Sequence, residues 1–478
     1  MLDMAQTPMR TADDLKANLQ DIQGGILREY DTLACQYLFF RIDDAAKGRA
    51  WLKALTEVVT SQAEASQGTP KNGTFNVAIS VWGLKALALP DAVIQSFPHA
   101  FLEGMRARAA KLGDVGASGP DNWEGKLGGD EIHVLVAISH ESVEACAKQH
   151  DWLSALTKRQ GGVAEVHAVE AEVVFEQRSG CPAAHFGYVD PISQPAIAGF
   201  DDEAMPGDGA LKPGGGWRSI KPGEFLLGYE NELGERTDTP GPQGLGDNGS
   251  FIVFRKASQD VAGFRDYLKQ GAMTLWGADD EAHQEKMAAK IVGRWRSGCP
   301  LALSPDKDDP EIAADPERVN DFDYGDDSDG SKCPFGAHLR RTNPRATKLT
   351  TTTDINRKRI LRRGLEYGPP LPEGAPDDGV DRGQAGVFVI ADIELQFEFI
   401  QSEWIGKGDF IGLPTEEKDP LVGANDPSGQ FTVPGADMPF LFDLKRFVTI
   451  RGGEYFFAPG ISALKGIAEG RFQTGDQK

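Results

Sequence analysis

The sequence predicts an α+β fold of two ferredoxin-like domains, because similar sets of strand and helix patterns occur in each half of its 478 residues. Short runs rich in β-branched and aromatic residues indicate strands, and longer segments with helical spacing of apolar residues separate them. In the first half these elements follow the order β-α-β-β-α-β, which is the ferredoxin-like unit. A chain of this length, 40% hydrophobic, also favours two domains over one.

The first half supplies four strand patterns and two helical patterns. The strand segments are CQYLFFRI (35–42), FNVAIS (75–80), HVLVAIS (133–139) and EVHAVEAEVVF (165–175). Helices are expected at about 45–59 and at 141–156. A loop rich in Gly and Pro, between Pro206 and Gly216, then separates the halves. We therefore expect an N-terminal domain over residues 1–210 and a C-terminal domain over residues 211–478.

The second half begins the same kind of pattern again. Its first strand segments are GEFLLGY (223–229) and GSFIVFR (249–255), followed by a helix at about 259–269. A strand GVFVIA (386–391), a helix at about 393–404 and a last strand EYFFAP (454–459) complete the expected set. The two halves are thus predicted to be similar α+β domains.

Composition excludes several classes of partner. The formal net charge of −22 argues against nucleic acid and against an anionic membrane surface, which both bind proteins with a surplus of Lys and Arg. No segment approaches the roughly 20 apolar residues of a membrane span, and the N-terminus lacks an apolar signal region. Five cysteines without a CxxC pair indicate neither a disulfide scaffold nor a structural zinc site. We expect a cytoplasmic protein.

Three motifs combine residues that carry chemistry. His338 lies in CPFGAHLRRTNPR (333–345), with three arginines close behind it. Asp190 lies in the loop FGYVDPISQP (186–195), and RILRRGLEYGPP (359–370) is strongly basic. Each motif also has a structural alternative: a buried histidine bonded locally, an aspartate that shapes a turn, and a solvated basic turn.

The three motifs, in this order, resemble those of the dye-decolourising peroxidases, which are haem enzymes of two ferredoxin-like domains of the dimeric α+β barrel type. The resemblance spans nearly the whole chain and implies a haem b site in the second domain. Supporting stretches are DIQGGIL (21–27), GEFLLGYENELG (223–234), NGSFIVFRK (248–256) and ADIELQFEFIQSEW (391–404).

The resemblance assigns roles to individual residues. His338 matches the histidine that ligates the haem iron, and Asp190 matches the carboxylate on the opposite, distal side of the haem. Arg362 matches the distal arginine, with Arg363 as the competing assignment. Pro191 stands where the family has Gly, which removes a backbone N–H from the aspartate's loop.

Other residues are expected to support the haem. At least one of Arg340, Arg341 and Arg345 would face a haem propionate. A carboxylate bonded to the outer nitrogen of His338 would make it a better ligand. Asp392 is the preferred candidate and Glu394 the alternative, although Asp392 would equally serve as a helix cap.

Tyr367 is a candidate for carrying electrons between a buried haem and bulky donors at the surface. Its alternative is a packing aromatic with a hydrogen-bonded hydroxyl.

The resemblance implies a peroxidase that reduces hydrogen peroxide and then oxidises small or bulky aromatic reductants, such as phenols and dyes, in one-electron steps. A haem-handling, deferrochelatase-like protein with weak peroxidase activity is the alternative. A third hypothesis is a pair of ferredoxin-like domains without haem, acting as a binding module. Edge strands and the resemblance also favour a homo-oligomer.

Overall fold

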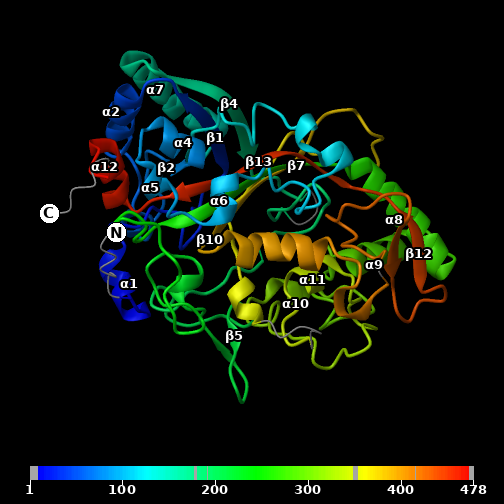
Figure 1. Ribbon diagram of the computed structural model, residues 1–478. Coiled ribbons are helices and arrows are strands. Elements are labelled where there is room, and N and C mark those ends of the chain that lie inside the picture. Colours follow the sequence, from blue (N-terminus) through cyan, green and yellow to red (C-terminus); the bar gives the residue numbers. More distant parts are fainter. Residues whose placement is uncertain (1–8, 177–179, 191, 348–353, 415, 473–478) are drawn as a thin grey trace.

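The computed structural model describes residues 9–176, 180–190, 192–347, 354–414 and 416–472 (Figure 1). Strands from both halves of the chain form one closed barrel. The order is β7-β13-β2-β3-β1-β4-β9-β10, and β10 pairs back with β7. The barrel strands are β1 (Ala34–Ile42), β2 (Thr74–Ile79), β3 (Val134–His140), β4 (Val163–Glu172), β7 (Ser250–Gln259), β9 (Leu365–Tyr367), β10 (Gly383–Ile390) and β13 (Val448–Ala458).

The barrel consists of one four-stranded sheet from each half. The first half gives β2-β3-β1-β4 and the second gives β9-β10-β7-β13. The sheets meet at two short seams, where Glu172 of β4 pairs with Glu366 of β9 and Phe457 of β13 pairs with Ile79 of β2. The prediction of an α+β fold with two ferredoxin-like units is confirmed. The domain boundary at residue 210 stays a prediction.

The first half follows the predicted order of strands and helices. Its two long helices are α2 (Ala45–Leu55) and α7 (Val143–Gln160). The Ser142 hydroxyl caps α7 by accepting a hydrogen bond from the Ala145 amide, and Gly161 ends the helix at a φ of 64°. Shorter helices are α1 (Ala12–Asn18), α3 (Gln62–Ala65), α4 (Val81–Ala86), α5 (Asp91–Ile94) and α6 (His99–Glu103), with 3-10 turns at Gly116–Ser118 and Pro120–Asn122.

The second half differs from the prediction at its first strand. Segment 223–229 is not a strand: a 3-10 turn spans Pro222–Glu224, and Gly228 has a φ of 89°. The apolar run was misleading because Phe225, Leu226 and Leu227 are fully buried without strand pairing. The missing strand is β9, which lies inside the RRGLEYG motif and pairs with β10.

With this correction the second half also has the order β-α-β-β-α-β. α8 (Val261–Trp276) follows β7, and two consecutive π-helical segments, Ile393–Glu398 and Ile400–Ile405, stand between β10 and β13. The remaining elements are α9 (Glu281–Val292), α10 (Pro310–Ala314), α11 (His338–Thr342), α12 (Ile461–Glu469), β5 (Ala210–Leu211), β6 (Trp217–Arg218), β8 (Leu361–Arg362), β11 (Gly429–Thr432), β12 (Phe440–Leu444), and 3-10 turns at Ile355–Lys358 and Phe410–Gly412.

Strand alternation divides the core into two layers. On β1, Cys35, Tyr37 and Phe39 belong to the cluster inside the barrel. Leu38 and Phe40 point the other way, into the cluster beneath the first-half helices. No helix in the described part of the chain is long and apolar enough to cross a bilayer.

The end of the chain packs on its beginning. α12 lies against α2, and both stand on the side of the molecule opposite α8 and α9 (Figure 1). Leu464 and Ile467 of α12 are buried in the same core as Trp51 and Leu55 of α2. The second half therefore completes the core of the first.

Leu464→Ala should lower the free energy of unfolding by about 2–5 kcal/mol, because it removes a fully buried side chain from this shared core. Urea unfolding followed by circular dichroism measures the change. Lys465→Ala, on the exposed face of the same helix, is the matched control. Equal stability of the two variants would contradict the role of α12 in the first-half core.

Candidate active site

A cavity of about 410 Å³ brings the three predicted motifs together. His338 from α11, Arg362 from β8 and Asp190 from the loop after β4 all line it. Apolar residues of the π-helical segments and of the neighbouring loop, including Ile400 and Leu421, form much of the remaining wall. A largely apolar cavity with a few convergent polar groups is typical of a cofactor site.

Asp190 and Arg362 lie beside each other in the wall of this cavity. Asp190 Oδ1 lies 3.8 Å from Arg362 Nη2, which also donates a hydrogen bond to the Ser193 carbonyl oxygen at 2.9 Å. Gln194 accepts a hydrogen bond from the Arg362 amide and donates one to the Arg362 carbonyl oxygen. These two bonds hold the aspartate's loop against β8. Pro191 lies outside the described residues.

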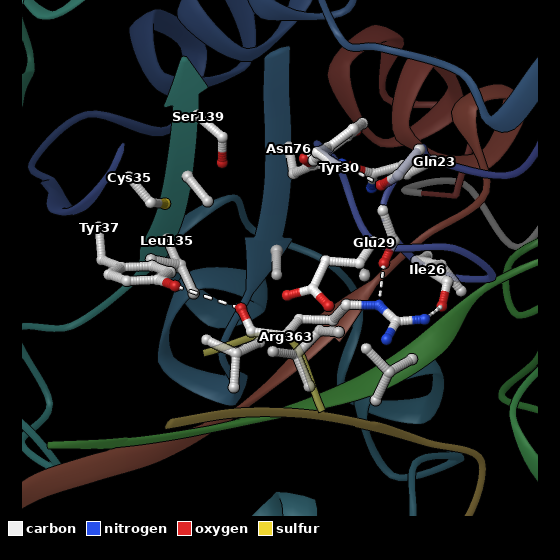
Figure 2. Close-up of a pocket in the computed structure, with 18 of the residues that line it drawn as sticks. Gln23, Ile26, Glu29, Tyr30, Cys35, Tyr37, Asn76, Leu135, Ser139 and Arg363 are labelled. Carbon is white, nitrogen blue, oxygen red and sulfur yellow. Dashed lines mark hydrogen bonds between the residues drawn. The ribbon is translucent and has the colours of Figure 1, made fainter. Parts of the chain in front are cut away.

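Arg363 points in the opposite direction, as neighbours on an extended chain do. Its Nε donates a hydrogen bond to the Gly25 carbonyl oxygen at 2.8 Å, and its Nη2 donates one to that of Ile26 at 3.2 Å. Figure 2 shows Arg363 along one wall of a separate cavity of about 110 Å³ inside the barrel. Arg362, rather than Arg363, is therefore the arginine beside Asp190.

His338 has a buried carboxylate partner. Its Nδ1 lies 2.8 Å from Asp419 Oδ2, while Asp419 Oδ1 accepts hydrogen bonds from the amides of Leu421 and Val422. Burial alone would raise the pKa of Asp419, but the attraction of His338 and these hydrogen bonds lower it. The other ring nitrogen of His338, Nε2, has no hydrogen bond to the part of the chain that the structure describes.

The prediction that Asp392 or Glu394 supports His338 is wrong. Asp392 caps the first π-helical segment, where its side chain accepts a hydrogen bond from the Leu395 amide at 2.8 Å. Glu394 accepts a hydrogen bond from Arg108 at 2.8 Å. The orphan amides at a helix start recruit a carboxylate locally, which is the alternative that the sequence left open.

Asp419 was missed because it stands 81 residues after His338, and no local pattern connects the two. Only the folded chain brings its loop beneath α11.

The three arginines after His338 have different roles. Arg340 is buried and bonded to Asp327 at 2.7 Å. Arg341 is fully buried, and its guanidinium donates only to backbone carbonyl oxygens, including those of Trp404 and Glu417. It does not line the cavity, so of the three candidates Arg341 is not placed to face a propionate.

Arg345 is the arginine of this group that lines the cavity. It donates hydrogen bonds to the Phe322 carbonyl oxygen at 2.5 Å and to Asn320, while its buried Nε has no partner within the described chain. Arg294 and Arg359 line the cavity as well, and burial lowers the pKa of each to about 10. All three remain cationic at neutral pH.

The cavity residues fit a haem group. Haem is a broad apolar ring with two carboxylates, and the cavity joins apolar walls to a cluster of Arg294, Arg345 and Arg359. His338, held in one orientation by Asp419, is a suitable iron ligand. Sequence reasoning missed Arg294 and Arg359, although Arg359 begins the motif RILRRGLEYGPP.

Tyr367 does not line this cavity. Its side chain is buried, its hydroxyl donates a hydrogen bond to Asp381 Oδ1 at 3.2 Å, and Lys256 Nζ lies 4.5 Å from its ring centroid. This geometry matches the packing alternative. Asp381 is exposed, so the hydroxyl of Tyr367 lies just beneath the surface.

Comparison with known proteins shows the same architecture. Residues 21–173 match the family described as the DyP dimeric alpha+beta barrel domain. The chain is 31% identical to dye-decolorizing peroxidase msp1 of Mycetinis scorodonius, over 98% of this chain and 90% of that protein. It is 28% identical to multifunctional dye peroxidase DyP2 of an Amycolatopsis species, over 94% of this chain and 96% of that protein.

Solved structures of dye-decolorizing peroxidases have the same fold as this chain. A DyP-type peroxidase from Auricularia auricula-judae superposes with a TM-score of 0.80 at 28% identity, over 96% of this chain and 99% of that one. A DyP variant from Pleurotus ostreatus gives a TM-score of 0.82 at 29% identity, over 94% and 99%. Because the similarity extends over almost the whole chain in both sequence and fold, this protein belongs to the dye-decolorizing peroxidases, which are haem-dependent enzymes.

Proposed function

We propose that this peroxidase uses haem b, ligated by His338, to reduce hydrogen peroxide, and that Asp190 and Arg362 are its distal catalytic residues. The observation that carries this proposal is the arrangement of the cavity. The Asp190–Arg362 pair and the His338–Asp419 pair line or support one enclosed space, beside a cluster of cations.

The two distal residues have separate tasks. Haem, when bound, supplies the electrons for cleaving the O–O bond. The Asp190 carboxylate accepts a proton from one peroxide oxygen and returns it to the other, which leaves as water. The Arg362 guanidinium, 3.8 Å from Asp190, stabilises the negative charge that develops on the leaving oxygen.

On the other side of the cavity, Asp419 orients His338. Because Asp419 accepts the Nδ1 proton, the unprotonated Nε2 is the nitrogen that can bind iron. The carboxylate also increases the basicity of the imidazole, which strengthens it as a ligand. Arg345, with an unpartnered buried Nε, would hold a haem propionate.

Phenolic and dye-like donors are the substrates that the relatives favour. One related dye-decolorizing peroxidase, 30% identical, has been solved in complex with 2,6-dimethoxyphenol. Oxidation of two such phenols supplies the two electrons that reduce one hydrogen peroxide.

We base the proposal of a cytoplasmic location on the thiols, because Cys35, Cys146, Cys299 and Cys333 are buried and form no disulfide within the described residues. Self-association stays a prediction.

The haem-handling alternative lacks a specific observation in its favour. A protein that only binds haem needs the ligand and the cationic cluster, but it does not need a carboxylate and an arginine beside each other in the wall of the cavity. Steady-state turnover of peroxide with a phenolic donor distinguishes the two. Haem binding with turnover no faster than free haemin would overturn the peroxidase assignment.

Asp419→Asn should weaken haem retention or activity about 10–100-fold, since His338 loses its anionic partner. The reduction potential of the haem should also rise, because a less basic imidazole stabilises oxidised iron less well. Haem transfer to apomyoglobin and redox titration measure both effects. Asp392→Asn is the matched control, since Asn is an equally good helix cap. A lowered retention in Asp392→Asn alone would contradict the assignment.

Asp190→Asn and Arg362→Leu should both retain haem and both slow its reaction with peroxide. We expect Arg362→Leu to be at least as slow, with losses of about 10²–10³-fold typical of removing an electrostatic stabiliser. Stopped-flow recording of the haem spectrum after mixing with peroxide measures the rate. If both variants react as fast as the wild type, the distal assignment fails. If only Asp190→Asn is slow, the ranking of the two residues is reversed.

Tyr367→Phe should slow oxidation of bulky dyes severalfold and spare the reaction with peroxide, if an electron leaves the buried haem through this ring. Loss of the hydrogen bond to Asp381 alone costs only about 1 kcal/mol of stability and leaves dye turnover unchanged. Comparing a large anthraquinone dye with a small phenol as donor separates the outcomes. Unchanged rates for both donors assign Tyr367 to packing.

A further inference from the structure

A second, smaller cavity of about 80 Å³ adjoins the distal residues. It shares Asp190, Arg362 and Gln384 with the large cavity, and Glu29, Gln194 and Glu366 also line it. Its volume accommodates several waters, each of which needs about 10–15 Å³. The carboxylate assigned to proton transfer therefore contacts a polar space that the proposed reaction does not otherwise use.

Glu366 is the most unusual group in this space. It lies on β9, and its side chain is 8% exposed. Oε1 accepts a long hydrogen bond of 3.4 Å from Gln384 Nε2, and the buried Oε2 has no hydrogen-bond partner within the described chain. A buried carboxylate without a cation or adequate donors is costly, so its neutral acid form is favoured.

The surrounding charges do not compensate Glu366. From the loop after β4, Asp190 repels it, and the exposed Glu172 is its cross-strand neighbour on β4. His185 Nε2 lies 4.0 Å from Oε2 but donates its proton to the Tyr367 carbonyl oxygen, and burial lowers the pKa of His185. The pKa of Glu366 is raised to about 8, mainly by burial and to a smaller extent by the negative charge of Asp190.

More distant charges also bear on this space. Arg382, on the turn into β10, lowers the pKa of His185, which further favours the neutral imidazole. Glu29 enters from the N-terminal loop, and burial raises its pKa against the opposing effect of Arg363. Arg362, the cation of the shared wall, is already beside Asp190.

Given the proposed peroxidase function, we propose that Glu366 is a proton store for Asp190, joined to it by water in the small cavity. Glu366 releases its carboxyl proton to a cavity water, and a proton from the same water chain passes to the Asp190 carboxylate. Asp190 becomes the acid, and Glu366 becomes the anion. This step moves one proton and no electrons.

The overall reaction shows why a store is useful. One hydrogen peroxide and two phenols give two waters and two phenoxyl radicals, so the two phenolic protons end in water. They are released where the donors are oxidised, whereas the waters form in the cavity. The first water is completed with the proton that Asp190 takes from the peroxide itself, so the store serves the second water. A filled store beside Asp190 supplies one of its protons at once, and Glu366 is recharged later by a proton from the oxidised donors.

The structure also provides a route for recharging. Glu29 lines both the small cavity and the cavity inside the barrel, where Tyr30, Cys35 and Ser139 supply further polar groups. Figure 2 shows the Glu29 carboxylate reaching into that barrel cavity near Arg363. Shared lining residues thus place the small cavity between the barrel interior and the distal residues.

Infrared spectroscopy tests the store directly and does not depend on turnover. Burial also raises the pKa of Glu224 and of Glu454 to about 7, so the band to follow is the one that titrates last. Wild-type protein should show a C=O band of a protonated carboxylic acid that disappears only as the pH is raised through about 8. Glu366→Gln should lack this band. Glu172→Gln, an exposed cross-strand neighbour, should keep it. Absence of the band from wild-type protein at pH 6, or its persistence in Glu366→Gln, would overturn the proposal.

Kinetics then test the link to Asp190. Glu366→Gln should lower kcat on the order of tenfold, less than the loss expected for a direct acid–base residue, and should remove the fall in kcat near pH 8. A wild-type rate and pH profile in Glu366→Gln would refute the store while leaving Asp190 and Arg362 in place. If the wild-type protein itself lacks peroxidase turnover, the proposed function fails, and the infrared result still reports the protonation of Glu366.

Discussion

The pairing of β10 with strands on both of its edges is the constraint on which the site depends. On one edge β10 pairs with β7 and closes the barrel. On the other it pairs with β8 and β9, so Phe388 is the partner of Arg362. Between those two short strands, Gly364 lies so close to β10 that a Cβ atom there would stand 2.4 Å from the Ala385 carbonyl oxygen. This close contact holds the segment against β10, and alternation along the extended chain points Arg362 towards the large cavity and Arg363 into the barrel.

Sequence patterns predicted the parts of the structure that local chemistry determines. The first-half elements, β7, β10 and β13 follow from strand and helix periodicity. His338, Asp190 and Arg362 followed from motifs, and the fold brings all three to one cavity. Segment 223–229 misled because full burial, and not strand pairing, explains its apolar residues. Asp419 and the small cavity depend on contacts between distant segments, which no local pattern encodes.

Buried polar groups around the cavities are of two kinds, those with a full set of hydrogen-bond partners and those without. The groups that orient His338 are bonded: Asp419 has the histidine and two amides, and Arg341 has several carbonyl oxygens. Two other groups are incompletely bonded, since Glu366 Oε2 and Arg345 Nε lack partners within the described residues. A complete hydrogen-bond network fixes the positions of its side chains, whereas a group without a partner is available to bind a ligand, a substrate or water. His338 is therefore held in one orientation, whereas Glu366 and Arg345 keep spare hydrogen-bonding capacity.

The two narrow seams of the barrel have a consequence for biosynthesis. The first-half sheet emerges from the ribosome with β2 and β4 as open edges, because their partners β13 and β9 lie far downstream. Unpaired edges invite association with other chains, and pairings between distant segments form slowly. β2 acquires its second partner only after residues 448–458 have been synthesised. The nascent protein is thus most exposed to misassembly in the interval before its last strand is released.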